Sequence, residues 1–266
     1  MGKMIEVRDL HFWHKGEDSP VLKGIEFEAS PHEITVILGP NGSGKTTLLK
    51  CILRLWEAQR GEVFINGRSI KVMGRGEVAK NVAIVPQDHE PPFPYSVFDV
   101  VLLGRVAHIG LLSSPSRRDK EAARRALEAL GIERLADRPY TKISGGERQL
   151  VLIARCLAQE APVMLLDEPT AHLDFRNQVM VLTKVKSIAK EKGLAVLMTL
   201  HDPNLALLFS DRVLLLNAGK VVARGSPNEV ITEENIKKVY GLDVAFISQD
   251  GMRMVCPKVQ LRSKVL

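Results

Sequence analysis

The sequence predicts an α/β fold in which a mostly parallel sheet is covered by helices on both faces, with an antiparallel sheet beside it. Short apolar strand patterns alternate with helical patterns over most of the 266 residues, and this alternation is typical of parallel sheets. Hairpin patterns near both ends of the chain predict the antiparallel sheet. Between Pro91 and Gln159 no strong strand pattern occurs, which indicates an inserted helical subdomain.

The first half of the chain carries the strand that leads to a candidate functional loop. The run ITVIL at 34–38 is apolar throughout and ends in glycine, as strands buried on both faces do. A helical pattern over 45–56 follows, with Leu48, Leu49 and Ile52 on one face. The strands expected in this half are 4–10, 21–29, 34–38, the two arms of an Asn-Gly hairpin over 62–70, and 82–85.

Helical and strand patterns alternate again in the second half. A helix is expected over 119–131, where apolar residues share one face and Gly131 ends the helix. Further helices are expected over 147–159 and around 175–192. The remaining expectations are strands at 163–167, 194–199 and 212–216, a hairpin through 217–220, and a small appendage at 241–266.

The stretch GPNGSGKT at 39–46 matches the phosphate-loop pattern G-x4-G-K-[ST] and lies between a buried strand and a helix. Glycines let backbone N–H groups curl around phosphate oxygens, and the helix N-terminus adds partial positive charge. Lys45 would reach the β- and γ-phosphates, and the Thr46 hydroxyl would hold Mg²⁺. We therefore expect a P-loop NTPase core of the RecA-like type rather than a plain glycine-rich turn. The nucleotide-binding residues expected here are Gly39, Pro40, Asn41, Gly42, Ser43, Gly44, Lys45, Thr46 and Thr47.

Polar side chains follow three further strand patterns. The run VMLLDE at 163–168 ends in two carboxylates at the C-terminal edge of a strand, where open parallel sheets bind ligands. Asp167 would hold Mg²⁺, directly or through water, and Glu168 is placed to take a proton from the attacking water; a solvated strand end is the alternative. His201 could touch the γ-phosphate and orient the water, although a lone histidine is as often structural. Gln87 could bridge magnesium and water.

Composition limits the class of protein. The chain is 45% hydrophobic and 26% charged, as ordinary globular proteins are. No apolar run is long enough for a membrane span and the N-terminus lacks a signal-peptide core, so we expect a chain that is neither inserted nor exported. The net charge of +6 comes from basic pairs scattered among acids, which indicates solvated helix faces; no nucleic acid is expected as a partner. Three cysteines without paired spacing indicate reduced, structural thiols.

The stretch ISGGERQL at 143–150 predicts a helix start. Ser144 and Glu147 have the Ser-x-x-Glu spacing of a capping box. That motif does not explain Gly145 and Gly146, because a glycine costs roughly 1 kcal/mol relative to alanine within a helix. Two glycines at this position therefore need a second reason.

The order GPNGSGKT, Gln87, ISGGERQ, VMLLDEP, AHLD and His201 resembles the nucleotide-binding subunit of an ABC transporter, and the resemblance covers nearly the whole chain. It implies ATP and Mg²⁺ as cofactors, a homodimer, and ATP hydrolysis coupled to translocation. It further implies a single ABC ATPase domain over 1–240, with a core at 1–88 and 160–240, a helical subdomain at 89–159, and the appendage at 241–266.

In that family two subunits pack head to tail, and each signature helix lies against the γ-phosphate bound by the other subunit. Carried over to this chain, the resemblance implies that the segment Ser144, Gly145, Gly146 and Glu147 approaches the ATP of the opposite subunit. The missing side chains of the two glycines would let the backbone come close. The stretch TAHLD, which ends in Asp174, would cross the dimer interface.

An aromatic residue, commonly tyrosine, stacks on adenine in this family just before the strand that leads to the phosphate loop. The matching position in this chain is His14, and Trp13 beside it is the alternative. Core packing is the expectation for the neighbouring Phe12.

The segment DHEPPFPYSVFDVVLLGR after Gln87 is similar to that of the ATPases of importers for iron–siderophore complexes, haem, vitamin B12 and, in some members, molybdate or tungstate. Phe93 and Tyr95 lie in its stiff, apolar loop, where such ATPases receive the coupling helix of the membrane subunit. The resemblance implies two membrane permease subunits, an extracytoplasmic substrate-binding protein, and a cytoplasmic, peripheral location on the cell membrane. It does not name the cargo, because specificity resides in the permease and the binding protein.

Two other classes of protein are alternatives to a transport ATPase. Soluble ABC ATPases that act on nucleic acid or ribosomes usually carry tandem ATPase halves or a long coiled-coil insert, and this chain has neither pattern. A degenerate, regulatory nucleotide binder would lack catalytic residues, whereas Lys45, Glu168 and His201 are all present.

Overall fold

The computed structural model describes residues 2–17, 19–87, 95–110 and 113–258. Its largest sheet has six strands in the order β10-β9-β3-β8-β7-β6, of which β10 alone is antiparallel to its neighbour. Strands β2-β1-β4-β5 form a separate antiparallel sheet, and β11 and β12 form a terminal hairpin. The strands are β1 Ile5–Phe12, β2 Leu22–Ala29, β3 Ile34–Leu38, β4 Arg60–Ile65, β5 Arg68–Ser69, β6 Val82–Val85, β7 Val163–Leu166, β8 Ala195–Leu200, β9 Arg212–Asn217, β10 Lys220–Gly225, β11 Val244–Gln249 and β12 Met252–Pro257.

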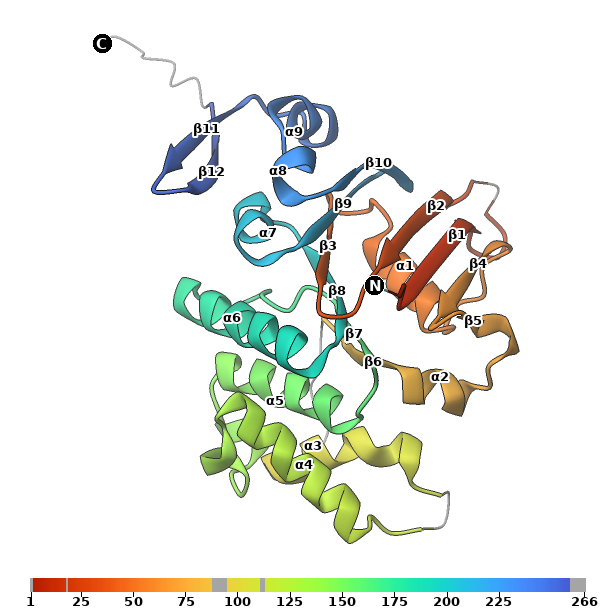
Figure 1. Ribbon diagram of the computed structural model, residues 1–266, viewed down its shortest axis with the longest axis vertical. Helices are drawn as coiled ribbons and strands as arrows, with labels where there is room; N and C mark the ends of the chain where they lie inside the picture. The colour runs from red at the N-terminus through yellow and green to blue at the C-terminus, as the bar shows by residue number, and fades with distance from the viewer. Residues whose placement is uncertain (1, 18, 88–94, 111–112, 259–266) are drawn as a thin grey trace.

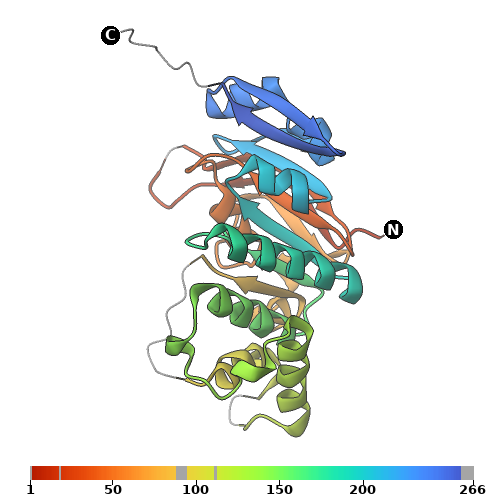
Figure 2. The same ribbon diagram turned by 90° about the vertical axis from the view of Figure 1, so that its left-hand side faces the viewer.

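Helices gather on the faces of the six-stranded sheet and in a separate lobe (Figure 1). Figure 2 shows this lobe at one end of the molecule and the terminal hairpin at the other, with the sheet between them. The α-helices are α1 Lys45–Ile52, α2 Arg75–Asn81, α3 Val97–Leu102, α4 Arg117–Leu130, α5 Gly145–Ala158, α6 Phe175–Lys192, α7 Pro203–Phe209, α8 Pro227–Val230 and α9 Glu233–Tyr240. Short 3₁₀ turns are η1 Ile70–Val72, η2 Leu103–His108, η3 Glu133–Leu135 and η4 Tyr140–Lys142.

Strand β3 lies inside the six-stranded sheet and is buried on both faces, as its unbroken apolar sequence predicts. Ile34, Val36 and Leu38 pack into the core cluster that includes the helical lobe. Ile37, on the opposite face of the strand, packs into a second cluster with α1 and the antiparallel sheet. The loop that follows β3 is therefore anchored at the junction of two hydrophobic cores.

The expected α/β class with an antiparallel sheet and a helical insert is confirmed, and two details differ. The closing hairpin belongs to the six-stranded sheet, because β10 pairs with β9 and β9 runs parallel to β3. The helix expected over 45–56 ends at Ile52, because Arg54 adopts a positive φ of 53° and turns the chain. The apolar side chain of Trp56, which extended the helical pattern, stacks instead on Phe12.

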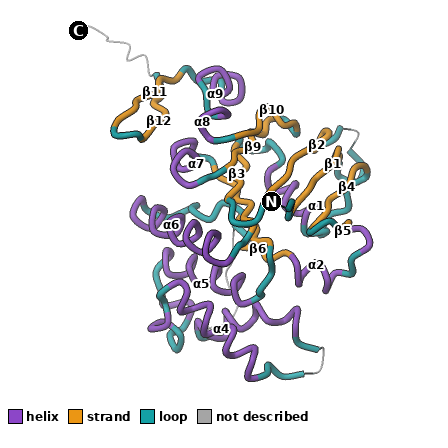
Figure 3. The backbone as a smooth tube through the Cα atoms, viewed as in Figure 1, coloured by secondary structure: helices purple, strands orange, loops and turns teal. Residues whose placement is uncertain are grey.

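Two features stabilise the helical lobe: a capping box at the start of each of three helices, and a clasp formed by the buried Arg105 and its hydrogen-bond partners. Helices α3, α4 and α5 each begin with a capping box formed by a serine and an acidic residue three positions later. Arg105, only 3% exposed, donates from Nε to Asp119 Oδ1 at 3.0 Å and from Nη1 to the Ala158 carbonyl at 2.6 Å and to Glu160 Oε2 at 2.8 Å. These contacts join η2 to α4 and to the end of α5. Figure 3 shows the resulting concentration of helix in this part of the chain.

Candidate nucleotide site

The loop 39–44 turns the chain from β3 into α1, and its glycines are required by geometry. A Cβ atom on Gly39 would lie 2.2 Å from the carbonyl oxygen of Leu216. Gly42 and Gly44 have φ angles of 76° and 104°, which side chains rarely tolerate. Because Gly44 caps α1 without a side-chain bond, the first N–H groups of this helix remain available to an anion.

Lys45 is the first residue of α1 and is only 5% exposed. Its Nζ donates to the carbonyl oxygens of Gly39 at 2.9 Å and Pro40 at 3.0 Å, so the ammonium lies along the loop. Burial lowers the pKa of this ammonium, and the nearby carboxylates of Glu168 and Asp167 oppose that shift. An added phosphate would act in the same direction as the carboxylates and favour the charged form.

Ser43 supplies an independent test of whether the loop fits phosphate. Its side chain is 2% exposed, and its Oγ has no hydrogen-bond partner among the described residues. A buried hydroxyl without a partner costs about 1–3 kcal/mol, so such groups are normally satisfied. A phosphate oxygen held by the loop would accept this bond, and the loop therefore fits a polyphosphate.

The ends of β7 and β8 bring a hydroxyl–carboxylate cluster to the start of α1. Asp167 Oδ1 lies 3.3 Å from Thr46 Oγ1 and accepts a 2.8 Å hydrogen bond from Thr199 Oγ1. Thr199 is fully buried, and its Oγ1 also accepts the backbone N–H of Glu168 at 2.7 Å. Carboxylate and hydroxyl oxygens are ligands that Mg²⁺ takes, and it commonly combines one or two protein groups with substrate phosphates. The cluster therefore fits a magnesium–nucleotide complex.

Glu168 is held by partners on both carboxylate oxygens. Oε1 lies 2.5 Å from His201 Nε2, and Oε2 accepts a 3.0 Å hydrogen bond from Gln87 Nε2. The backbone of Glu168 adopts a positive φ of 50°, a conformation that costs a non-glycine residue about 1–3 kcal/mol. Strands β6, β7 and β8 thus aim three predicted catalytic side chains at one another.

These residues line a common groove of about 420 Å³. Gln87, Glu168 and His201, which follow β6, β7 and β8, line it together with residues of the phosphate loop. The residues 144–147 are not among those that line this groove. Its lining consists of Val21, Asn41, Gly42, Gly44, Lys45, Thr46, Thr47, Gln87, Glu168 and His201.

The predicted capping box at the start of α5 is present. Ser144 Oγ accepts the backbone N–H of Glu147 at 3.3 Å, and the Glu147 carboxylate accepts the backbone N–H of Ser144 at 3.1 Å. Arg134 donates to the other Glu147 oxygen at 2.8 Å, and the hydrogen bond from Ser144 lowers the pKa of this carboxyl. The two glycines differ: a Cβ on Gly146 would lie 2.6 Å from Asn177 Oδ1, whereas one on Gly145 would meet nothing closer than 3.8 Å.

Asp174 caps α6 within its own chain. Its Oδ1 accepts the backbone N–H of Asn177 at 2.8 Å, and its Oδ2 accepts the Asn177 side-chain amide at 3.1 Å. Because the same amide packs against Gly146, Asn177 connects the start of α6 to the start of α5. The close packing of Gly146 is thus explained inside one chain, and Gly145 remains the open position.

Of the described residues, the predicted adenine contacts His14 and Trp13 and the predicted permease contact Tyr95 are not part of the lining of this groove. His14 packs edge-on against Trp56, with ring centroids 5.0 Å apart, and Trp13 is half-buried beside it. Phe12 is 6% exposed and belongs to the core, as expected. Tyr95 is 43% exposed, and Phe93 lies outside the described residues.

Thr199 and Asn177 were missed by the sequence reasoning. The only signal for Thr199 is a hydroxyl residue in the apolar run AVLMTL just before His201. Asn177 gives no signal of its own, because its importance comes from its packing against a glycine of another helix.

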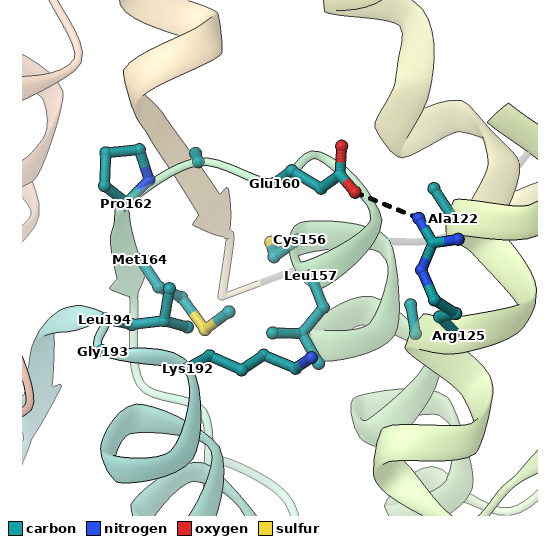
Figure 4. A pocket seen from close by; sticks show the side chains of 12 residues that line it. Ala122, Arg125, Cys156, Leu157, Glu160, Pro162, Met164, Lys192, Gly193 and Leu194 are labelled. Carbon is teal, nitrogen blue, oxygen red and sulfur yellow. Dashed lines mark hydrogen bonds and ion pairs between the residues drawn. The ribbon is translucent and has the colours of Figure 1, made fainter. Parts of the chain in front are cut away.

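A second cavity, of about 460 Å³, lies where the helical lobe meets the core (Figure 4). Apolar residues such as Leu157 and Met164 line it together with Arg125 and Glu160, whose side chains are 3.3 Å apart. None of the predicted site residues is in its lining. The phosphate loop and the carboxylates thus identify the smaller groove as the nucleotide site.

A mostly parallel sheet with a phosphate loop after one strand and an Asp-Glu pair after another defines a nucleoside-triphosphate-binding protein of the P-loop class. The family model for ABC transporters matches residues 22–171. The chain therefore belongs to the ABC transporter family, as an ATP-binding subunit and transport ATPase.

Individual relatives agree with this assignment. The chain is 41% identical over 254 residues to an ABC transporter ATP-binding protein of Methanocaldococcus jannaschii, covering 96% of this chain and 98% of the relative. It is 37% identical over 239 residues to the ferric enterobactin transport ATP-binding protein of Escherichia coli, covering 89% and 88%. A solved structure of a metal-chelate type ABC transporter in an inward-facing conformation matches with a TM-score of 0.86 and 32% identity, covering 97% and 98%. The expected resemblance to the importer branch is confirmed.

Proposed function

We propose that two copies of this chain hydrolyse ATP between them and thereby drive import of a metal chelate through two membrane permease subunits. The observation that carries this proposal is that Lys45, Glu168 and His201 line one groove, where Asp167 contacts the lining residue Thr46. The groups proposed to hold the β- and γ-phosphates and to take a proton from water all lie on a single chain. The part that moves the transporter would come from the second copy.

The residues of the groove have separate roles in the proposed reaction. The loop N–H groups and Lys45 hold the β- and γ-phosphates and offset the charge that develops on the γ-phosphate. Glu168 takes a proton from a water molecule while the oxygen of that water attacks the γ-phosphorus. The products are ADP and phosphate. His201 and Gln87 fix the direction of the Glu168 carboxylate, because each bonds one of its oxygens. Mg²⁺ held by Thr46 and Asp167 would neutralise phosphate charge.

The start of α5 would complete the site from the other copy. It offers helical N–H groups and the open Gly145, while the carboxylate of Glu147 is already bound by Arg134 and Ser144. A γ-phosphate there would be attracted by the helix terminus without repulsion from a free acid. Hydrolysis removes that phosphate and would loosen the dimer.

The Glu168→Gln variant tests both halves of this proposal. Its turnover should fall by about 100-fold or more, the usual loss for a general base, while ATP stays bound. Size-exclusion chromatography with light scattering should then show an ATP-dependent dimer that the wild type forms only transiently. The exposed Glu128→Gln serves as a matched control. Wild-type turnover of Glu168→Gln, or a monomer at saturating ATP, would contradict the proposal.

A surface formed by residues of both the core and the helical lobe suits the proposed permease contact. Leu55 and Leu103 are 67% and 50% exposed, and both line a cavity of about 460 Å³ together with Ile84 of β6. Along the chain, Tyr95 comes directly after residues 88–94, which lie outside the described residues. This apolar surface includes residues of the core and of the helical lobe. A permease helix bound there would therefore be displaced when the lobe moves relative to the core.

The cargo proposal rests on relatives rather than on residues of this chain. One relative is named for ferric enterobactin transport and the matching transporter structure is of metal-chelate type. We therefore rank iron–siderophore complexes first, followed by haem, cobalamin and molybdate or tungstate. Stimulation of ATP turnover by one cargo, in proteoliposomes with the permease and an extracytoplasmic binding protein, would decide among them.

The location proposal is a peripheral one, on the cytoplasmic face of the membrane and attached through the permease. Among the described residues, no helix has both the length and the apolar character that a membrane crossing requires. The proposed division remains a core at 1–88 and 160–240, a helical subdomain at 89–159 and an appendage at 241–266.

A further inference from the structure

The terminal hairpin of β11 and β12 packs beside α7 and α9 (Figure 1). Its inner face carries Val244 and Val255, which are both buried and belong to the same core cluster as Leu205 of α7. Arg253 of β12 also donates from Nη1 to the carbonyl oxygen of Asn228 in α8 at 3.1 Å. The hairpin is therefore anchored to the rest of the chain by a buried face as well as by a surface contact.

Asn204 joins this hairpin to the first turn of α7. Its Oδ1 accepts the backbone N–H of Val255 at 2.7 Å, and its Nδ2 donates to the Val255 carbonyl oxygen at 3.2 Å. A strand at the edge of a sheet leaves such groups unpaired, and the Asn204 amide occupies the place that a further strand would take. One side chain thus satisfies both backbone polar groups of a buried residue.

The same asparagine stands only three residues after His201. Asp202 caps α7, and its Oδ1 accepts the backbone N–H of Asn204 at 2.7 Å. The ring of Pro203, between these two residues, fixes its φ at about −65°. The turn from His201 to Asn204 therefore has little freedom, because β8 holds one end of it and the hairpin holds the other.

The end of α9 also lies close to this turn. Tyr240 is the last residue of α9, and its hydroxyl is buried without a hydrogen-bond partner among the described residues. Burial and, to a smaller extent, the nearby Asp202 carboxylate raise the pKa of this phenol. The cap of α7 is thus placed next to α9 as well as to the hairpin.

The imidazole of His201 depends on this turn for its direction. Its side chain is 42% exposed, and its Nε2 lies 2.5 Å from Glu168 Oε1. Because a side chain with this exposure is only partly confined by packing, the backbone that carries it decides where its ring nitrogen points. A shift of the turn would move the imidazole relative to the candidate base.

We propose that Asn204 is a positioning residue for His201: by binding Val255, it lets the terminal hairpin set where the imidazole lies relative to Glu168. The inference rests on the proposed ATPase function and adds a role for the hairpin in turnover. Residues of the hairpin are absent from the described lining of the nucleotide groove, so the hairpin acts through the turn at 201–204.

The test measures kcat and the KM for ATP in the full chain. Asn204→Ala should lower kcat about tenfold and leave KM near its wild-type value, because a misplaced group slows the chemical step while the phosphate loop is unaltered. A raised KM with wild-type kcat would overturn the inference.

Asn204→Asp is a second variant that preserves folding. It keeps the shape of the side chain, and a carboxylate suits the first turn of a helix, but it cannot donate to the Val255 carbonyl oxygen. It should therefore lower kcat in the same direction as Asn204→Ala. Wild-type kcat in both variants would overturn the inference.

Asn235→Ala is the matched control for general destabilisation. Asn235 lies in α9, and its Nδ2 donates to the Val230 carbonyl oxygen at 2.9 Å. Its replacement removes a comparable side-chain-to-backbone bond at the same end of the molecule, outside the turn at 201–204. It should keep wild-type kcat even where its melting temperature falls as far as that of Asn204→Ala. An equal loss of kcat in Asn235→Ala would show a merely structural effect and overturn the inference.

A double-variant cycle assigns the effect to the imidazole. Single-turnover hydrolysis, with the protein in excess over ATP, keeps slow variants measurable. If Asn204 acts through His201, Asn204→Ala combined with His201→Ala should be no slower than His201→Ala alone. A further loss in the double variant, as large as that of Asn204→Ala in the wild type, would overturn the inference.

Failure of the inference and failure of the proposed function give different results. If Lys45→Ala hydrolyses ATP as the wild type does, the phosphate site is wrong and the proposed function fails. If Lys45→Ala loses turnover while both Asn204 variants keep wild-type kcat, only the positioning role fails.

Discussion

The nucleotide groove and the start of α5 are two sites built in opposite ways. In the groove, Lys45, Gln87, Glu168 and His201 come from four separate strand–loop junctions and meet only because parallel strands end at one edge. At the start of α5, the contacts of Ser144 with Glu147 are made within three residues of chain. The first site is a product of the sheet, and the second is a product of local sequence.

This difference indicates which site is complete. At the groove lie the Lys45 ammonium and the pair Thr46 and Asp167, whose oxygens could bind Mg²⁺. The candidate base Glu168 has a partner on each carboxylate oxygen. The start of α5 contains helical N–H groups, the open Gly145 and an acid already bound by Arg134, but no group that could activate water. The start of α5 could therefore bind a phosphate but could not hydrolyse it. We expect it to act together with the nucleotide groove of another copy of the chain.

The largest expected effect is at the groove. Lys45→Ala should reduce ATP turnover by at least about 100-fold, because it removes a preorganised charge from the developing γ-phosphate. Steady-state phosphate release measures the loss, and circular dichroism checks that the fold survives. Lys192→Ala, at the rim of the other cavity, should turn over ATP normally. Normal turnover in Lys45→Ala would remove the basis for comparing the two sites.

The next largest effect should separate the two glycines of the signature. Gly145→Ala has room within the chain, so its melting temperature should not fall, yet its turnover should drop about tenfold or more if a partner's phosphate packs there. Gly146→Ala should lower stability as well, because its methyl group would meet Asn177. Wild-type turnover in Gly145→Ala would show that the start of α5 faces solvent throughout the cycle.

A smaller loss of turnover is expected when Thr199 is replaced, because Thr199 holds Asp167 and the backbone of Glu168 in place. Thr199→Val removes the bonds to Asp167 and to the Glu168 backbone and should cost roughly 1–3 kcal/mol of unfolding free energy. Turnover should fall about tenfold through misorientation of the carboxylates.

Thr35→Val is the matched control for Thr199→Val. Thr35 lies on the adjacent strand and is also buried, but its hydroxyl has no hydrogen-bond partner among the described residues. Its replacement should therefore be neutral or stabilising. Chemical denaturation of both variants measures the difference, and equal losses would contradict the role given to the Thr199 hydroxyl.

The smallest effect on turnover should come from the clasp of the helical lobe. Hydrogen bonds from Ser116 and Arg105 lower the pKa of Asp119 to about 2. A lowered folded-state pKa stabilises the fold above the unfolded value near 3.8, and this contribution is lost as pH falls through about 2.

Asp119→Asn should lower the melting temperature by a few degrees at neutral pH and flatten its fall between about pH 4 and pH 2, with near-normal ATP binding. Scanning calorimetry over that pH range measures both effects. An unchanged acid profile would show that another carboxyl controls this transition.

Much of the fold could be predicted because its patterns are local. A few adjacent residues are enough to predict the strand at 34–38, the Asn-Gly hairpin and the capping box of α5. The short helix α2 escaped prediction because Val78 is its single buried residue. The placement of β10 escaped because a hairpin pattern does not say which sheet it joins.

The sequence by itself determined the phosphate loop, the strand-end acids and the helix starts, because each depends on residues adjacent along the chain or at fixed short spacings. Only the tertiary structure decided that Gln87 and His201 bind the two oxygens of Glu168, that Thr199 supports Asp167, and that Trp56 reaches His14. Such contacts depend on how strands align at a sheet edge and how a helix end meets another sheet. No short sequence pattern encodes those distances, because they result from the packing of the whole core.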